Sequence, residues 1–273
     1  MKEEYLDLPR FEVTINDLVA ELTGHYYHQK PWQLNPGKAA LLVLDMQNYF
    51  LDPSSHAFTP SAPAIVPNIL KLMEMARKFE MKIIFTKHVN DDKNADMMGK
   101  WWKDVLTDGR WESGISKTLG LYDCKTAGLY DCKTVLLYDS MTLRMESPVR
   151  DDSMVEMKAG TTKSPVRDDS MVGRYNEMMI VKSQYDAFYN TAMEEYLRLQ
   201  NIEQVIITGL LANLCCETTA RSAFVRGFEV FFPVDATAAY SREFHLSTFR
   251  NLGFGFCPIL KTSELIDSLN EPK

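Results

Sequence analysis

Two adjacent cysteines, Cys215 and Cys216, stand at the start of a helical pattern in this sequence. A β-rich apolar run at 205–208 precedes them, and the chain turns at Gly209 before a loop of small residues. A helix N-terminus exposes unpaired backbone N–H groups and partial positive charge, both of which favour a thiolate. The pattern therefore predicts that one of the two cysteines is a nucleophile, without indicating which.

Two more reactive side chains follow strand-like runs elsewhere. Asp45 follows the apolar run 39–44, and Lys182 follows the run 178–181. Ligands of open α/β sheets bind beyond the carboxyl ends of the strands, so these groups and the cysteines are expected along one rim. A carboxylate could accept the thiol proton, an ammonium stabilises a thiolate, and the amides of the 209–215 loop could form an oxyanion hole. For Asp45 alone, capping of the next turn is an equally good interpretation.

The elements that would hold these side chains alternate between strand and helix. Unbroken apolar runs such as 39–44 are typical of parallel sheets that are covered on both faces. Strands are predicted at 39–44, 81–86, 178–181, 205–208, 229–234 and 255–260, and helices at 65–79, 191–200, 217–226, 243–251 and 263–269. This alternation predicts an α/β fold with a doubly wound, Rossmann-like, mostly parallel sheet and helices on both faces, in three layers.

The composition narrows the possible functions. With 273 residues, 45% hydrophobic and 25% charged, the chain is typical of a soluble globular protein. A net charge of −7 argues against a nucleic-acid partner, and no run approaches the roughly 18 apolar residues of a membrane span. The acidic first residues do not resemble a signal peptide, and five cysteines do not suggest a disulfide framework. We therefore expect a cytoplasmic protein with free thiols and no membrane partner.

The first 37 residues differ in character from the rest. They form an irregular N-terminal arm at 1–37, and we expect this arm to cover a domain surface or a neighbouring subunit. Residues 38–273 are expected to form the main domain. The aromatic and turn-forming residues of the arm are Tyr26, Tyr27, Pro31 and Trp32.

An atypical insert interrupts the main domain at about 118–173. Residues 121–126 recur at 129–134, and residues 147–155 recur at 164–172. Solenoid repeats need periods of about 20 residues or more, so these copies are interpreted as segment duplications without a catalytic role. Cys124 and Cys132 are interpreted as residues copied with the duplicated segment, without a role of their own, rather than as zinc ligands.

The motifs around the reactive residues resemble those of a known enzyme superfamily. They are LLVLDMQNYF at 41–50, IIFTKH at 83–88, VKSQYDAFYNT at 181–191, VIITGLLANLCCETTARSAFVRGFEV at 205–230 and VDATAAYS at 234–241. In this order they are similar to the isochorismatase-like cysteine hydrolases, which include nicotinamidases, carbamoylsarcosine and ureidoacrylate amidohydrolases, biuret hydrolase and isochorismatases. The resemblance covers most of 38–105 and 174–260, and nothing in it matches 118–173.

The resemblance implies a catalytic Asp–Lys–Cys triad at Asp45, Lys182 and Cys215. Counted from Gly209, the family spacing places the nucleophile at Cys215. Cys216 falls where relatives carry a small or apolar residue, so it is interpreted as a buried thiol. The implied reaction is hydrolysis of a C–N bond in a small amide, ureide or carbamoyl compound through a thioester, with no cofactor.

The loop before the cysteines also has an implied geometry. The family has a non-proline cis peptide in this loop, which falls here at Leu210–Leu211. It is expected to direct the amides of Leu211 and Cys215 at the substrate oxygen.

Two other functions stay open at this point. Isochorismatases cleave a vinyl ether without a cysteine nucleophile and commonly have glycine at the position of Cys215, so the cysteine favours amide hydrolysis. A catalytically idle oligomeric binding protein is the third possibility, because the insert could block the site. A homo-oligomer is expected in each case, from the resemblance and from the aromatic arm.

The metal site of nicotinamidases uses an Asp-x-His pair after the first strand. This chain has Asp52-Pro53-Ser54 there, so no metal is expected, and His56 is interpreted as a loop histidine. Five side chains are expected to form the walls of a substrate pocket, with core packing as the alternative for the aromatic ones. They are Gln47, Phe50, Trp101, Tyr185 and Phe188.

Overall fold

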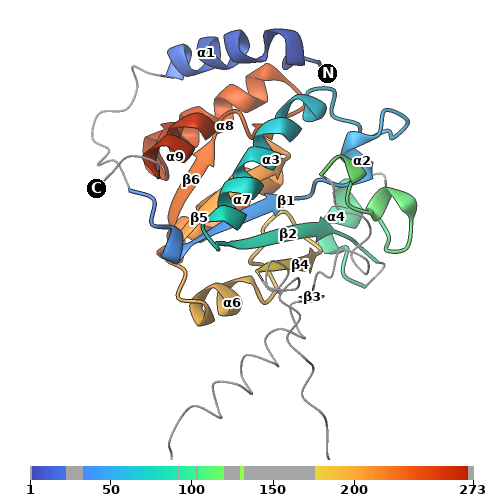
Figure 1. The fold of residues 1–273 in the computed structure, drawn as a ribbon. Coiled ribbons are helices and arrows are strands. Elements are labelled where there is room, and N and C mark those ends of the chain that lie inside the picture. Colours follow the sequence, from blue (N-terminus) through green and yellow to red (C-terminus); the bar gives the residue numbers. More distant parts are fainter. Residues whose placement is uncertain are drawn as a thin grey trace, which may run out of the picture.

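A twisted parallel sheet forms the centre of the molecule (Figure 1). The computed structural model describes residues 2–22, 33–91, 93–102, 104–119, 130–131 and 176–269. The strand order is β3-β4-β2-β1-β5-β6-β8, and β7 pairs with the end of β5. The strands are β1 Ala39–Leu44, β2 Lys82–His88, β3 Tyr130–Asp131, β4 Glu177–Lys182, β5 Gln204–Leu210, β6 Glu229–Pro233, β7 Thr237–Ala238 and β8 Ile259–Leu260.

The most apolar strands occupy the middle of the sheet. β1 lies between β2 and β5, with Leu42 opposite Ile84 on one side and Ile207 on the other. Every residue of β1 and of β5 is buried. Burial on both faces explains why these runs lack the alternation of a half-exposed strand. The predicted parallel α/β sheet is confirmed.

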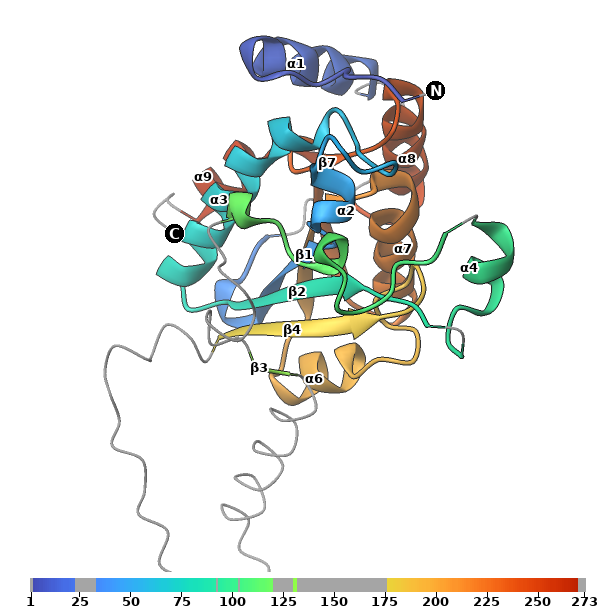
Figure 2. The same ribbon diagram turned by 90° about the vertical axis from the view of Figure 1, so that its right-hand side faces the viewer.

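Helices cover both faces of the sheet, which gives three layers. Figure 2 shows α3 and α9 on one side of the sheet and α7 and α8 on the other. Buried residues of α3 recur at helical spacing, as at Ile65, Ile69, Leu72 and Ala76. The helices are α2 Asn48–Leu51, α3 Ala62–Lys78, α4 Asp96–Trp101, α6 Met193–Leu199, α7 Glu217–Val225, α8 Arg242–Gly255 and α9 Thr262–Ser268. Short 3₁₀ turns lie at Pro36–Lys38, Trp111–Ser113 and Lys117–Leu119.

The N-terminal arm is more regular than its composition indicates. A 3₁₀ turn at Leu8–Arg10 leads into α1, Phe11–Leu22, which lies across α8 at the top of Figure 1. The residues of α1 that are buried are Phe11, Ile15, Leu18 and Leu22, a spacing that forms one apolar stripe. The turn residues and aromatic residues of the arm, Tyr26, Tyr27, Pro31 and Trp32, lie outside the described residues.

The last predicted strand is wrong in its extent. A strand was expected at 255–260, but α8 continues to Gly255 and β8 spans only Ile259–Leu260. Phe249 and Leu252 are buried and continue the helical period, so tertiary contacts extend the helix past its predicted end. Ser241 begins this helix by accepting a hydrogen bond from the amide of Phe244 at 3.2 Å.

The repeated insert lies almost wholly outside the described residues. Of its predicted span 118–173, the structure describes 118–119 and the short strand β3, which pairs in parallel with β4. The interpretation of the repeats, of Cys124 and of Cys132 therefore stays a prediction.

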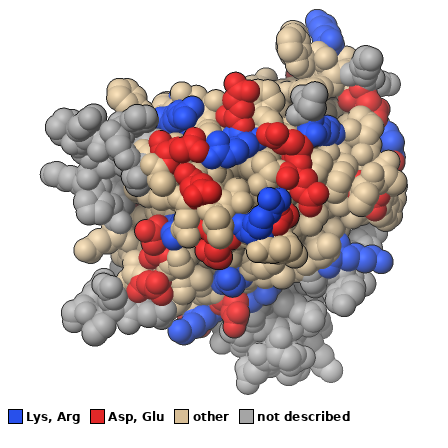
Figure 3. All heavy atoms as spheres, turned by 90° about the horizontal axis from the view of Figure 1, so that it is seen from above, with Lys and Arg blue, Asp and Glu red and all other residues tan. Residues whose placement is uncertain are grey.

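Charged side chains of both signs are interspersed on the face seen in Figure 3. One mixed cluster joins α1 to α8, where Glu21 contacts both Arg242 and Arg250. Among the helices that the structure describes, none combines the length and apolar character needed to cross a membrane.

Gly209 is required where β5 passes the end of β1. Its φ is +106°, and a Cβ built on it would lie 2.1 Å from the carbonyl oxygen of Leu44. Because the obstacle is backbone of the neighbouring central strand, it cannot move aside as a flexible side chain would. A side chain at this position would force apart the strands that carry Asp45 and the cysteine loop.

We expect Gly209→Ala to lower the free energy of unfolding by about 2–4 kcal/mol, through backbone strain and this collision. Urea unfolding monitored by circular dichroism measures the change. Gly255→Ala is the matched control, because nothing lies within 4 Å of a Cβ there. A Gly209→Ala protein as stable as the Gly255→Ala protein would contradict the required close approach.

Candidate active site

Three side chains from distant parts of the chain meet at the carboxyl edge of the sheet. Asp45 directly follows β1, Lys182 is the last residue of β4, and Cys215 lies in a π-helical turn, Ala212–Cys216, between β5 and α7. All three are buried. Asp45 adopts a φ of +50°, which turns its side chain away from the line of the strand.

The ammonium of Lys182 links the other two groups. Its Nζ lies 2.7 Å from Oδ2 of Asp45 and donates to Sγ of Cys215 at 3.3 Å. The carbonyl oxygen of Gln184 accepts a further hydrogen bond at 3.0 Å. One ion pair and two hydrogen bonds thus hold the ammonium between the carboxylate and the thiol.

Asp45 is fixed by the next strand. Thr86 of β2 donates from Oγ1 to Oδ1 of Asp45 at 2.6 Å, and the amide of Asp45 donates back to Oγ1 of Thr86 at 3.1 Å. This exchange leaves Oδ2 of the carboxylate for Lys182 and the thiol. The Thr86 hydroxyl is a positioning group that no sequence motif indicated.

The protonation states follow from burial and charge. Burial alone would raise the pKa of Asp45, but the Lys182 ammonium, together with His88 and the hydrogen bond from Cys215, holds that pKa below its ordinary value. Burial, together with the Asp45 carboxylate, raises the pKa of the Cys215 thiol to about 12, and Lys182 opposes this shift only in part. Asp45 is therefore a carboxylate and Cys215 a neutral thiol near pH 7. The base is thus deprotonated while the thiol still carries its proton.

The two cysteines differ in their surroundings. Cys215 lines a cavity, whereas Cys216 is fully buried, with its Sγ 3.9 Å from the carbonyl oxygen of Thr208. Burial raises the pKa of Cys216 well above its usual value. Only the first of these two thiols is placed where a small molecule could meet it.

The loop before Cys215 contains the cis peptide bond that the resemblance implies. The Leu210–Leu211 peptide bond is cis. The carbonyl of Leu211 accepts the amides of Leu214 and Cys216 at 3.0 and 3.2 Å. Those two amides are therefore engaged and cannot act as oxyanion donors.

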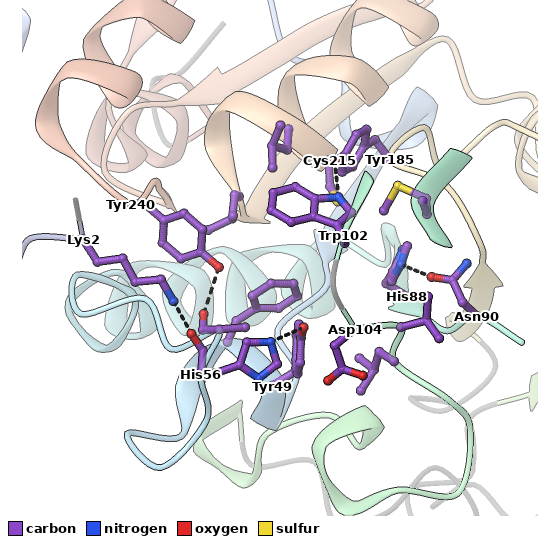
Figure 4. A pocket seen from close by; sticks show the side chains of 17 residues that line it. Lys2, Tyr49, His56, His88, Asn90, Trp102, Asp104, Tyr185, Cys215 and Tyr240 are labelled. Carbon is purple, nitrogen blue, oxygen red and sulfur yellow. Dashed lines mark hydrogen bonds between the residues drawn. The ribbon is translucent and has the colours of Figure 1, made fainter. Parts of the chain in front are cut away.

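A cavity of about 200 Å³ opens beside Cys215 (Figure 4). Two of the five predicted wall residues, Phe50 and Tyr185, line it. Aromatic rings form much of its surface: Tyr49, Phe50, Trp102, Tyr185 and Tyr240. A volume of this size suits a small molecule.

Gln47 and Phe188 do not line the cavity. The Nε2 of Gln47 donates to the carbonyls of His88 and Ser113 at 3.0 and 2.8 Å, and its Oε1 accepts the amide of His88 at 2.8 Å. Gln47 thus braces the end of β2 behind the cavity. Phe188 is buried beside Phe228, with ring centroids 5.9 Å apart, so core packing accounts for it.

The tryptophan prediction is displaced by one residue. Trp101 is the last residue of α4 and is 75% exposed, whereas Trp102 lines the cavity and donates from Nε1 to the hydroxyl of Tyr185 at 2.7 Å. The end of α4 turns these adjacent side chains in different directions. The sequence contains no signal that would separate them.

Several polar groups at the cavity were not predicted. The polar and charged side chains that line it are Lys2, His56, His88, Asn90 and Asp104. Nδ2 of Asn90 donates to the carbonyl of Ser183 at 2.8 Å, so its Oδ1 is the acceptor for Nε2 of His88 at 2.7 Å. Burial and the nearby Lys182 lower the pKa of His88 to about 4, so its ring is neutral near pH 7.

His56 contributes to the cavity wall as well as to its loop. Its Nε2 lies 3.0 Å from the hydroxyl of Tyr49. The interpretation of His56 as a loop histidine thus needs extending, because the loop itself forms part of the cavity.

A sequence model of the Isochorismatase domain matches residues 39–127 and 140–264, well over half of the chain. The chain belongs to the isochorismatase family. This agrees with the resemblance carried by the motifs at 41–50, 181–191 and 205–230, so the predicted membership is confirmed.

This isochorismatase-family hydrolase is 30% identical over 254 residues to Nicotinamidase 3 of Arabidopsis thaliana, covering 92% of this chain and 98% of that protein. It is 27% identical over 243 residues to Isochorismatase of Bacillus subtilis, covering 87% of this chain and 60% of that protein. A solved cysteine hydrolase structure from Pseudomonas syringae matches with a TM-score of 0.63 and 19% identity, over 89% of this chain and 99% of that one. The last comparison supports the fold alone.

The family metal site does not fit the residues present in this hydrolase. Oδ1 of Asp52 accepts hydrogen bonds from the amide and the hydroxyl of Ser54, so Asp52 stabilises its own turn. Within the described ranges, no three His, Cys, Asp or Glu side chains are grouped to hold a metal ion. No step below depends on a metal.

The raised pKa of Cys215 in this isochorismatase-family hydrolase predicts a steep pH dependence of alkylation. Only the thiolate reacts with iodoacetamide, and its fraction grows about tenfold per pH unit while the pH stays below the thiol pKa. We expect the labelling rate of Cys215 to rise in this way from pH 7 to pH 9 without a plateau, as measured by mass spectrometry of the tryptic peptide. The Cys216→Ala background assigns the label to Cys215, and a plateau below pH 8 would contradict a neutral resting thiol.

Proposed function

We propose that this hydrolase cleaves a C–N bond of a small amide, ureide or carbamoyl compound through a thioester on Cys215. The observation that carries the proposal is the position of the Lys182 ammonium, 2.7 Å from Asp45 and 3.3 Å from the Cys215 sulfur. A base, a cation and a thiol in contact are the components of an activated sulfur nucleophile. The similarity to a nicotinamidase over 92% of the chain supports the same reaction class.

In the first step, Asp45 removes the thiol proton as the sulfur of Cys215 attacks the carbonyl carbon. The C=O π electrons move to oxygen, and the S–C bond forms. Lys182 compensates the negative charge as it moves from carboxylate to sulfur and then to substrate. The amides of Leu211 and Cys215 are the proposed donors to the oxyanion, since those of Leu214 and Cys216 already bond to the Leu211 carbonyl.

In the second step, the tetrahedral intermediate collapses. Protonated Asp45 donates its proton to the leaving nitrogen, the C–N bond breaks, and ammonia or an amine departs. Water then attacks the thioester while Asp45 takes a proton from it. Collapse breaks the C–S bond, and the proton returns to sulfur, which restores the thiol and releases the acid.

Vinyl-ether hydrolysis is the second candidate, because the Bacillus subtilis relative is an isochorismatase at 27% identity. Cys215 argues against it, since that reaction as inferred from the family needs no sulfur nucleophile. A catalytically idle binding protein is the third, and the buried ion pair of Lys182 with Asp45 argues against it because an unused buried charge is costly. Homo-oligomer formation and a cytoplasmic location stay predictions from the sequence.

Ammonia release from a panel of amides, ureides and carbamoyl compounds tests the proposal, with isochorismate assayed in parallel. Release from at least one C–N compound, lost in Cys215→Ala, is the expected result. Turnover of isochorismate that survives Cys215→Ala, with no ammonia from any compound, would replace the proposal by the vinyl-ether reaction.

A further inference from the structure

The N-terminal segment contributes Lys2 to the cavity lining, and this lysine meets the ring of Tyr240, about 240 residues away in the chain. The amide of Glu3 donates to the carbonyl of Tyr240 at 2.9 Å, and the hydroxyl of Tyr5 accepts the amide of Ala239 at 2.9 Å. The amide of Leu6 donates to Oγ of Ser61 at 3.1 Å. These bonds tie the segment to residues 239–240 and to Ser61. The position of Lys2, which directly precedes Glu3, is therefore defined.

Lys2 directs its ammonium to the cavity (Figure 4). Its Nζ donates to the carbonyls of His56 and Phe58 at 2.6 and 3.0 Å and lies 4.3 Å from the ring centroid of Tyr240. Two of the three ammonium N–H groups thus have neutral acceptors, and the third is available. Among the described residues, no carboxylate lies within ion-pair distance of Lys2.

The other cations near the cavity are paired with carboxylates. Asp45 and Lys182 neutralise each other at 2.7 Å, and His88 is neutral. The other charged residue among the described lining residues is Asp104, which lies 3.7 Å from Arg110, and Arg110 also pairs with Glu112 at 3.1 Å. Lys2 is therefore the one cation of the described lining, and no carboxylate pairs with it at the edge of a cavity whose walls are largely aromatic. Its side chain is also exposed, so an entering solute can reach it.

We propose that Lys2 makes this site selective for substrates that carry an anionic group, such as a carboxylate, apart from the bond that is cleaved. The anion accepts the third ammonium hydrogen while the carbonyl lies at Cys215. A charge-assisted hydrogen bond of this kind is stronger than one to a neutral group, and the aromatic walls weaken screening by solvent. The substrate class rests on the proposed function, whereas the charge selectivity of the cavity does not.

Thiol alkylation tests the charge selectivity without any knowledge of the substrate. Iodoacetate and iodoacetamide have the same size and differ by one negative charge, and both label Cys215 by mass spectrometry of its peptide. We expect Lys2→Met to lower the iodoacetate-to-iodoacetamide rate ratio about three- to tenfold, and about 1 M salt to weaken this difference. Lys2→Arg keeps the charge and is expected to keep the ratio.

Two controls separate charge from structure. Lys78→Met removes another lysine that lies over an aromatic ring, Phe79, outside the cavity, and is expected to leave the ratio unchanged. Lys2→Arg is the second control, because it keeps the positive charge at the same position. An unchanged ratio in Lys2→Met, or an equal fall in Lys2→Arg, overturns the proposal.

The substrate class is then tested with a matched pair of amides, succinamate and succinamide. Lys2→Met is expected to lower kcat/KM for the anionic amide by about three- to tenfold more than kcat/KM for the neutral amide. Charge-selective labelling without ammonia release would support Lys2 and contradict the proposed function. Ammonia release with an unchanged succinamate-to-succinamide ratio of kcat/KM in Lys2→Met would support the proposed function and contradict the role of Lys2.

Discussion

Cys215→Ala is expected to lower kcat/KM for ammonia release by about 10⁴-fold or more, because it removes the atom that forms the thioester. Cys216→Ala is expected to keep most of the activity. Its thiol is fully buried, contacts the carbonyl of Thr208 and is absent from the cavity wall. Steady-state assays on the best substrate of the panel measure both variants.

The stability of the two variants provides the control. Cys216→Ala truncates a fully buried side chain and is expected to cost about 1 kcal/mol of unfolding free energy, an effect seen in urea but not in kcat. Cys215→Ala should remain folded, so that its lost activity is chemical. Activity that survives Cys215→Ala but is lost in a folded Cys216→Ala protein would reverse the assignment of the nucleophile.

Lys182→Met is expected to have the largest effect on stability. It leaves the Asp45 carboxylate buried without its cation, and breaking a buried pair in this way typically costs about 3–5 kcal/mol. Lys38→Met is the matched control: Lys38 pairs with Glu203 at 2.6 Å, but on the surface, where such pairs contribute about 0–1 kcal/mol. Urea unfolding at pH 7 measures both.

The sign of the pH dependence follows from Asp45. In the wild type, Lys182 holds the pKa of Asp45 below its unfolded value of 3.8, so the contribution of the pair is complete above that value and is lost only at lower pH. In Lys182→Met, burial without a cation raises the same pKa above 3.8. The destabilisation is then full at neutral pH and is relieved as the pH falls through the raised pKa.

The difference in unfolding free energy between wild type and Lys182→Met should therefore narrow from pH 7 to pH 4.5. The double variant Asp45→Asn, Lys182→Met removes both charges and should be more stable at pH 7 than Lys182→Met alone. A pH-independent difference, or a double variant less stable than the single one, would show that Asp45 is not the carboxylate that Lys182 neutralises.

The fold was predictable because its signals are local. The apolar runs that form β1 and β5 are unbroken because both faces of these strands are buried. Such runs can be recognised in the sequence without knowing which helices cover them. Asp45, Lys182 and the cysteine loop follow such runs. The rule that parallel strands end at one edge places them together before any contact is known.

The cavity walls were less predictable. Gln47 lies close in sequence to Asp45, and Phe188 lies close to Lys182, yet Gln47 hydrogen-bonds to the end of β2 and Phe188 packs in the core. Trp101 and Trp102 are adjacent and of the same type, so the sequence does not distinguish them. The end of α4 decides which of the two side chains contacts Tyr185. Side-chain direction at a helix end depends on where the helix stops, and sequence patterns define such boundaries poorly.

By itself, the sequence determined the parallel sheet, the family and the order of the reactive groups along one rim, because strand periodicity and motif spacing are properties of neighbouring residues. The tertiary structure decided which thiol faces the cavity, which charge state each partner holds, and that Lys2 joins the site. Burial and electrostatic compensation depend on atoms brought together from segments up to 238 residues apart, as with Lys2 and Tyr240. No local pattern contains that information.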